Sequence, residues 1–250
     1  MSAMNESQRL FGIVQGRLTA SPLDQLQRFP QEAWEEEFFS AANVGIEFIE
    51  LLTERQYNSN NPVWSDEGRK KIKDLCVESK CSIYSICTDY IIDHSLIFDP
   101  DDSTYEHVNM FLHASGDLGC KIAVFPLLEE SDLTPESSDL LVPLIKDFAA
   151  TAAKYGITIC IETLLNGENL IAFLEAVDEP NVKAVYDTGN RIIDTLDLDG
   201  EIRLLGNKIA HVHVKDKNIE HENVLLGTGR VNFMKVFQAL GDINYTGPLV

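Results

Sequence analysis

The run ITICIET, residues Ile157–Thr163, decides the fold of this chain because segments of the same kind recur along the whole sequence. The run is short, apolar and rich in β-branched residues, and polar side chains end it. Longer stretches, in which apolar residues recur three or four positions apart, separate such runs. This alternation predicts repeated βα units around a parallel sheet.

Eight strand-like runs can be counted. They are Leu10–Arg17, Gly45–Leu52, Ser82–Asp89, Lys121–Leu127, Ile157–Thr163, Val182–Thr188, Ile209–Asp216 and the short GPLV at Gly247–Val250. The helical stretches include Pro30–Asn43, Asp66–Ser79, Thr104–Leu118, Pro135–Tyr155 and a less regular one within Arg191–Lys208. Gly45, Gly119 and Gly156 follow three of them, where left-handed helix caps are expected.

Such units can close into a barrel or remain an open doubly wound sheet. The first run, LFGIVQGR, offers two glycines and no G-x-G-x-x-G motif, which argues against a dinucleotide-binding open sheet. Polar groups also follow many strands rather than gathering at one crevice. The sequence therefore predicts a (β/α)8 TIM barrel, cut at its eighth strand, as a single domain over residues 1–250.

Charge and composition restrict the partners. The chain has 40 acidic and 20 basic residues, a formal net charge of −20, which disfavours nucleic acid and anionic membrane surfaces. The opening MSAMNESQRLFGIVQ lacks a secretory pattern and no apolar run is long enough to span a bilayer, so we expect a cytoplasmic protein. Five dispersed cysteines in apolar stretches predict reduced thiols rather than disulfides or a zinc cluster.

Three consecutive strand runs end in a residue that can bind a metal ion. These residues are Glu162, Asp187 and His213. Side chains at the carboxyl ends of barrel strands meet in one shared mouth. Two carboxylates and one imidazole suit a single divalent ion such as Mn²⁺, Mg²⁺, Co²⁺ or Zn²⁺. One such residue alone would more often be an ordinary structural group.

The run IAHVHVKD carries two histidines that period-two alternation places on one face, together with Lys215. His213 lies nearer the carboxyl end of the strand and is the predicted ligand. His211 lies one layer deeper, where it would support the ligand residues or simply belong to the core.

Other polar residues end or closely follow strand runs and are candidates for binding a substrate. Arg17 and Lys215 could equally be solvated charges, while Glu50 and Asp89 could equally cap the helices that follow them. The candidate substrate-binding residues are Arg17, Glu50, Asp89, Asn190 and Lys215.

The order of IET, YDTGN, HVHVKD and LLGTGRVNF resembles the sugar-phosphate isomerase/epimerase group of the xylose-isomerase-like barrels. The resemblance covers essentially the whole chain, and its specificity lies in the order and spacing of the motifs. It implies metal ligands after strands five to eight, of which Glu162, Asp187 and His213 match the first three. The fourth, a glutamate, would follow Val250. Either the sequence is truncated there, which we expect, or this member lacks the ligand.

The resemblance also implies a reaction in which two carboxylates exchange a proton next to a substrate carbonyl. Glu162 is the catalytic candidate, and the glutamate expected after Val250 would be the other. The pattern at Asp187–Asn190 is similar to ketopentose-5-phosphate 3-epimerases, whereas free-ketose epimerases tend to carry histidine in place of Asn190. The substrate is therefore expected to be a small sugar or sugar phosphate, and a homo-oligomer remains open.

Two other functions remain open. A phosphodiesterase resembling the type IV AP endonucleases would need further histidines, but Cys87–Asp89, Phe125–Pro126 and Asn190 stand in those places. A barrel that has lost catalysis and only binds a ligand stays an alternative, because the eighth-strand glutamate is not in this sequence.

Overall fold

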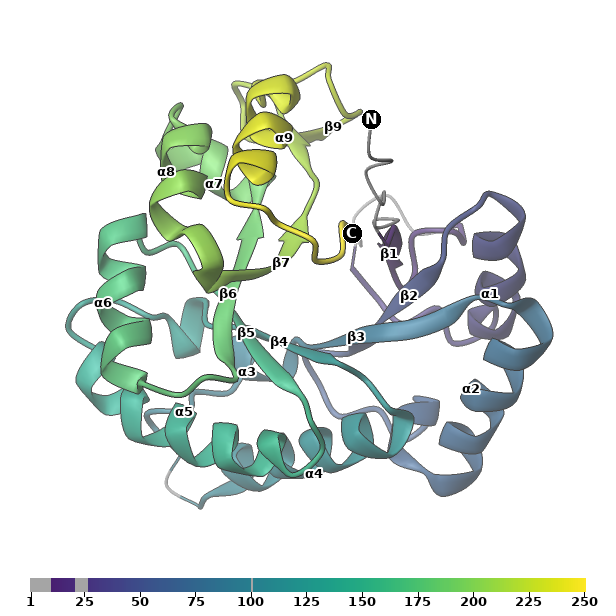
Figure 1. Cartoon of the computed structure of the whole chain (residues 1–250). Helices are drawn as coiled ribbons and strands as arrows, with labels where there is room; N and C mark the ends of the chain where they lie inside the picture. Colours follow the sequence, from purple (N-terminus) through teal and green to yellow (C-terminus); the bar gives the residue numbers. More distant parts are fainter. Residues whose placement is uncertain (1–9, 21–26, 100) are drawn as a thin grey trace, which may run out of the picture.

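Seven parallel strands form one curled sheet in the order in which they follow along the chain (Figure 1). The computed structural model describes residues 10–20, 27–99 and 101–250. The strands are β1 (Gly12–Val14), β2 (Phe48–Thr53), β3 (Ser82–Thr88), β4 (Ile122–Pro126), β5 (Thr158–Glu162), β6 (Val182–Asp187) and β7 (Ile209–His213). Seven of the eight predicted runs are thus strands of one parallel sheet, as in a TIM barrel.

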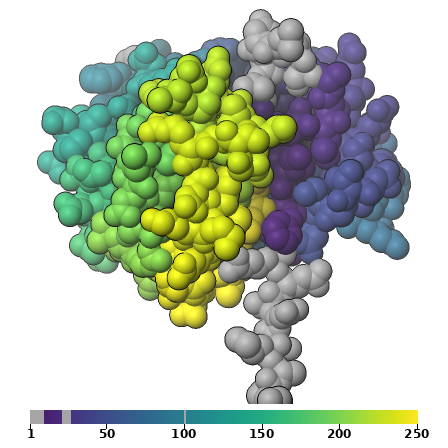
Figure 2. Space-filling view, turned by 90° about the horizontal axis from the view of Figure 1, so that it is seen from above, coloured from purple at the N-terminus to yellow at the C-terminus, as the bar shows by residue number. Residues whose placement is uncertain are grey.

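The eighth run, GPLV, lies between the two edges of this sheet. Leu249 forms parallel bridges both with Phe11 beside β1 and with Val212 in β7. Val250 N donates a hydrogen bond to Val212 O at 3.0 Å. In the space-filling view the yellow C-terminal part of the chain accordingly lies next to the purple N-terminal part (Figure 2). The run therefore occupies the eighth-strand position, although it forms bridges rather than a full strand.

Helices surround the ring of strands (Figure 1). They are α1 (Trp34–Asn43), α2 (Asp66–Ser79), α3 (Tyr90–Asp93), α4 (Ser103–Leu118), α5 (Ser138–Ala153), α6 (Gly167–Val177), α7 (Thr188–Asp194), α8 (Leu198–Leu205) and α9 (Phe233–Asp242), with 3₁₀ turns η1 (Pro62–Trp64), η2 (Glu129–Ser131) and η3 (Gly206–Lys208). Gly119, with φ 78°, adopts the predicted left-handed conformation after α4.

The predicted strand Ile209–Asp216 was too long at its carboxyl end. Strand β7 ends at His213, and a small antiparallel hairpin follows, formed by β8 (Asp216–Lys217) and β9 (Asn223–Val224). The physical reason is the buried carboxylate of Asp216, which accepts hydrogen bonds from Gly227 N and Gly229 N at 2.9 and 2.8 Å. These bonds tie the segment that follows the hairpin back to Asp216.

Most of the apolar core lies between the sheet and the helices, and a smaller group fills the inside of the barrel. Leu52 belongs to the inner group, and Glu50, two residues earlier on β2, shares its face. All five cysteines are free, as predicted. Within the described ranges, no helix is both long and apolar enough to cross a membrane.

Candidate active site

A cavity of about 820 Å³ opens at the carboxyl ends of the strands and collects every site residue that was predicted from the sequence. Residues that follow β1, β2 and β3 line one side of this cavity, and residues that follow β5, β6 and β7 line the other. The predicted residues that line it are Arg17, Glu50, Asp89, Glu162, Asp187, Asn190, His213 and Lys215.

The three predicted metal ligands converge on one side of the cavity. Glu162, Asp187 and His213 end the neighbouring strands β5, β6 and β7, and Asp187 is paired in register with His213. Their ligand atoms all lie within 4.8 Å of one another. We call these three residues the ligand cluster.

The geometry of the ligand cluster fits a divalent ion. His213 Nδ1 lies 3.8 Å from both Glu162 Oε2 and Asp187 Oδ2. Donors that share an ion at about 2.1 Å lie about 3–3.5 Å apart, so a small inward movement would bring all three into range. Two carboxylates and an imidazole also have the donor chemistry that Mn²⁺, Co²⁺ and Zn²⁺ accept.

Neighbouring polar groups orient the two carboxylates. Asp187 Oδ1 accepts hydrogen bonds from Gly189 N and Asn190 N, both at 2.8 Å, and so caps α7. Asn190 Nδ2 donates to Glu162 Oε1 at 2.8 Å. Lys215 Nζ lies 3.2 Å from Asp187 Oδ2 and from Asn190 Oδ1. One oxygen of each carboxylate is therefore held by N–H groups of the protein while the other faces His213, and the Asp187 oxygen that faces His213 also contacts Lys215.

Burial changes the acidity of this group. It raises the pKa of Glu162 to about 7; His213 opposes that rise and Asp187 adds to it. Burial also disfavours the imidazolium of His213, but the carboxylates of Glu50, Glu162 and Asp187 raise its pKa to about 9. A carboxyl group with a pKa near neutrality can both accept and donate a proton, as a general acid/base requires.

Glu50 lies deeper, beneath His213, and is only 1% exposed. Its Oε1 lies 3.0 Å from His213 Nε2, and its Oε2 lies 2.6 Å from both His211 Nε2 and Ser85 Oγ. Burial would raise the pKa of Glu50, but His213 and His211 hold it well below its ordinary range. His211, predicted to support the ligands or belong to the core, is fully buried against this carboxylate.

Arg17 lines the side of the cavity across from the ligand cluster. It lies in a turn whose backbone is held in place. Gly16 N donates to both oxygens of the buried Glu37 at 2.9 Å, and Leu18 N donates to its Oε1 at 3.2 Å. The backbone on both sides of Arg17 is thus fixed, while its own side chain is exposed. Such a turn directs the guanidinium toward the cavity rather than leaving it on an arbitrary surface.

Asp89 lies near Arg17 and is almost completely buried. Its carboxylate accepts hydrogen bonds from Gln27 Nε2 at 2.9 and 3.1 Å and contacts Cys87 Sγ at 3.3 Å. Burial raises the pKa of Asp89 to about 6.

Sequence reasoning missed the residues that support the predicted ones. Ser85 and Glu37 hold Glu50 and the Arg17 turn, and Gln27 and Arg55 line the cavity from loops. A rule that reads only strand ends can detect none of them, because they lie within elements or in loops. Gln15 was detectable: it directly follows β1 and its Oε1 accepts a hydrogen bond from Leu52 N at 3.2 Å.

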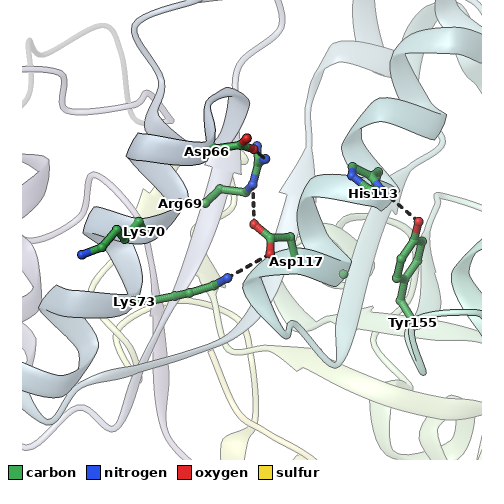
Figure 3. A pocket seen from close by; sticks show the side chains of 8 residues that line it. Asp66, Arg69, Lys70, Lys73, His113, Asp117 and Tyr155 are labelled. Atoms are coloured by element: carbon green, nitrogen blue, oxygen red, sulfur yellow. Dashed lines mark hydrogen bonds and ion pairs between the residues drawn. The ribbon is translucent and has the colours of Figure 1, made fainter.

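A second, outer hollow of about 590 Å³ is lined by residues of α2 and α4 and by Tyr155 (Figure 3). It shares no lining residue with the cavity at the barrel mouth. Its charges are paired with one another: Arg69 contacts Asp66 and Asp117, and Lys73 Nζ lies 3.0 Å from Asp117 Oδ1. His113 Nδ1 lies 2.9 Å from the Tyr155 hydroxyl. Since these groups satisfy each other, the hollow does not offer the chemistry found at the barrel mouth.

The chain belongs to the xylose isomerase-like TIM barrel family, whose model matches residues 38–250. Among curated relatives, a D-psicose 3-epimerase of Ruminiclostridium cellulolyticum is 30% identical over 117 residues, which are 44% of this chain and 39% of that protein. An L-ribulose-5-phosphate 3-epimerase, UlaE, of Escherichia coli is 23% identical over 229 residues, which are 87% of this chain and 81% of the relative. The match to the first relative thus spans well under half of that protein's length.

Solved structures support the fold. A D-psicose 3-epimerase from Clostridium cellulolyticum H10, crystallised with D-tagatose, superposes with a TM-score of 0.75 at 19% identity, covering 96% of this chain and 83% of that one. A xylose isomerase domain protein from Planctomyces limnophilus gives 0.71 at 17% identity, covering 96% and 87%. At these identities the likeness establishes the TIM-barrel fold alone, which confirms the predicted fold class.

Proposed function

We propose that this chain is a metal-dependent sugar or sugar-phosphate isomerase or epimerase that moves a proton on the carbon next to a carbonyl. The observation that carries the proposal is the ligand cluster at the mouth of the barrel. Two carboxylates lie there beside an imidazole, each with one oxygen facing His213 Nδ1. Relatives named as ketose and ketose-phosphate 3-epimerases support the same class of reaction.

In this proposal Glu162, Asp187 and His213 hold one divalent cation. The cation would polarise adjacent carbonyl and hydroxyl oxygens of the substrate and so make the neighbouring C–H more acidic. Glu162 removes that proton and returns it as a general acid/base. Asn190 keeps the Glu162 carboxylate in a fixed orientation through its 2.8 Å hydrogen bond.

The side of the cavity formed by residues on and after β1, β2 and β3, which we call the early-strand side, would bind the rest of the sugar. The side formed by β5, β6 and β7 is the late-strand side. Asp89 accepts hydrogen bonds from sugar hydroxyls, and Arg17 contacts the terminal hydroxyl or phosphate from its fixed turn. Lys215 and Asn190 contact hydroxyls closer to the ligand cluster. Relatives named for free ketoses and for a ketose phosphate both exist, so we assign the substrate class as sugar or sugar phosphate.

Deuterium exchange tests the proposal directly. The protein is incubated with Mn²⁺ in D₂O together with either a ketose or a ketose 5-phosphate, and deuterium at the carbon next to the carbonyl is followed by NMR. We expect incorporation with at least one substrate and its loss in Glu162→Gln. Glu168→Gln, on the exposed start of α6, is the matched control and should behave like the parent protein.

Exchange and net conversion report different steps. Exchange requires only removal and return of a proton by Glu162, whereas formation of an epimer also requires a second acid on the opposite face of the carbon. Exchange that persists in Glu162→Gln would refute the assigned role of this carboxylate. Absence of exchange with every ketose tested, in protein that binds Mn²⁺, would refute the proposed reaction.

A further inference from the structure

The buried Glu50 connects two histidines that are both on β7. Both of its oxygens are occupied by protein groups: Oε1 by His213, and Oε2 by His211 and Ser85. At 1% exposure, with both oxygens taken, this carboxylate is poorly placed to bind a sugar hydroxyl. Its contacts point to a role inside the protein.

The imidazole ring of His213 can turn only one of its two nitrogens toward Glu162 and Asp187. Nε2 lies 3.0 Å from Glu50 Oε1, while Nδ1 lies 3.8 Å from the carboxylates of Glu162 and Asp187. A carboxylate on one ring nitrogen favours a proton there, so the other nitrogen is the one that gives up its proton and offers a lone pair to a metal ion. The Glu50 contact therefore selects both the tautomer and the orientation of the ring.

Glu50 is itself held on its other oxygen. Ser85 Oγ and His211 Nε2 both lie 2.6 Å from Oε2, and all three side chains are fully or almost fully buried. His211 Nδ1 is buried without a hydrogen-bond partner in the described part of the chain, so Nε2 is the nitrogen that carries its contact. These two donors fix the carboxylate at a single position beneath His213.

We propose that Glu50 is a positioning residue of the metal site: it holds His213 through Nε2 so that Nδ1 faces Glu162 and Asp187, and Ser85 and His211 hold Glu50 in turn. The inference rests on the proposed function, because it assumes that the ligand cluster binds a cation. It changes the role expected for Glu50 from contacting substrate to orienting a ligand.

Mn²⁺ affinity of Glu50→Gln is the first test, with free Mn²⁺ measured by electron paramagnetic resonance. The glutamine amide would turn an N–H group toward one of the donors that now contact the carboxylate, so the ring of His213 loses its fixed orientation. We expect the dissociation constant for Mn²⁺ to rise about 10- to 100-fold. Ser85→Ala, which removes one donor but keeps Glu50, should raise it about two- to tenfold.

Glu37→Gln is the matched control. Glu37 is as buried as Glu50 at 1% exposure, but it contacts the backbone of Gly16 and Leu18 rather than a histidine. Its replacement should lower the midpoint of thermal unfolding while Mn²⁺ affinity stays within about twofold. Equal weakening of Mn²⁺ binding in Glu37→Gln and Glu50→Gln would overturn the proposal, because general loosening of the barrel would then explain both.

The second test is the ¹⁵N NMR spectrum of the histidine rings in the Zn²⁺-loaded protein. We expect a protonated Nε2 and a metal-shifted Nδ1 for His213, and loss of this pattern in Glu50→Gln. An unchanged spectrum and unchanged Mn²⁺ affinity in Glu50→Gln would overturn the inference, and Ser85→Ala serves this purpose if Glu50→Gln does not fold.

Both tests are independent of turnover. A parent protein that binds Mn²⁺ with the expected tautomer but exchanges no deuterium would refute the proposed reaction and leave the role of Glu50 standing. A parent protein that binds no divalent cation would overturn both.

Discussion

The two sides of the barrel mouth use acidic residues differently. On the late-strand side, Glu162 and Asp187 each keep one oxygen facing His213 Nδ1 at 3.8 Å. On the early-strand side, Glu37 and Glu50 have both oxygens occupied by hydrogen-bond donors of the protein. A carboxylate whose two oxygens are satisfied within the protein supports the structure, whereas two neighbouring carboxylates that turn an oxygen toward the same imidazole can share a cation.

The largest expected effect comes from removing the late-strand ligands. His213→Ala should raise the dissociation constant for Mn²⁺ at least about 100-fold and abolish deuterium exchange, while circular dichroism shows a folded protein. Asp187→Ala should do the same and cost about 1 kcal/mol more in stability, because it also removes the cap of α7. Unfolding of these variants with unchanged Mn²⁺ affinity per folded molecule would instead assign both residues a structural role.

The next effect tests whether the early-strand side binds the substrate. Arg17→Ala should raise KM for a ketose 5-phosphate about 10- to 100-fold, and much less for the free ketose, because one charge-assisted contact is lost. Steady-state kinetics with both substrates measure this difference. Arg203→Ala on the outside of α8, where Arg203 pairs with Asp199 and Asp242, is the control. An equal loss for both substrates would argue against a phosphate contact.

A pH titration of stability tests the buried Asp89. Its pKa is raised to about 6 in the folded protein, so its contribution to stability is present below about 3.8 and is lost as the pH rises through about 6. The free energy of unfolding of the parent relative to Asp89→Asn should therefore fall between pH 4 and 7. At about 1.4 kcal/mol for each pKa unit, the fall is at most about 3 kcal/mol.

Asp117 provides a control of opposite sign for this titration. Its pKa is lowered by Lys73 and Arg69 on the outer surface, so its contribution is present above its unfolded pKa and is lost as the pH falls. Urea unfolding of the parent and of both variants is followed from about pH 2 to about pH 7. The stability of the parent relative to Asp89→Asn should fall as the pH rises through about 6, whereas its stability relative to Asp117→Asn should fall as the pH drops below about 3.8. The same trend in both would mean that the burial of Asp89 does not control its acidity.

The smallest effect is expected outside the mouth. Lys73→Ala, in the outer hollow of Figure 3, removes an exposed ion pair with Asp117 and should change stability by no more than about 1 kcal/mol. Mn²⁺ affinity and deuterium exchange should be unchanged. A clear loss of either would show that the outer hollow is coupled to the barrel mouth.

The sequence by itself predicted the barrel and the convergence of Glu162, Asp187 and His213. Periodic apolar runs define strands and helices locally. In a parallel barrel, the carboxyl ends of all strands lie at the same mouth. Glu162, Asp187 and His213 could therefore be predicted as neighbours before any contact was known, and the structure brings them together. The carboxyl end of the seventh strand was misjudged because Asp216 contacts glycines more than ten residues further along the chain.

Only the tertiary structure decided which acidic residues have their oxygens occupied by donors of the protein and which turn an oxygen toward the cavity. Glu50 and Asp89 both end strand runs, and nothing local separates them from Glu162. The difference depends on which donors lie opposite: Glu50 meets histidines more than 160 positions away, at separations of 161 and 163 residues. Glu37, within α1, is likewise turned into a buried support by the backbone of a distant turn. Hydrogen bonds between remote segments leave no periodic trace in a sequence, because they are formed only when the barrel closes.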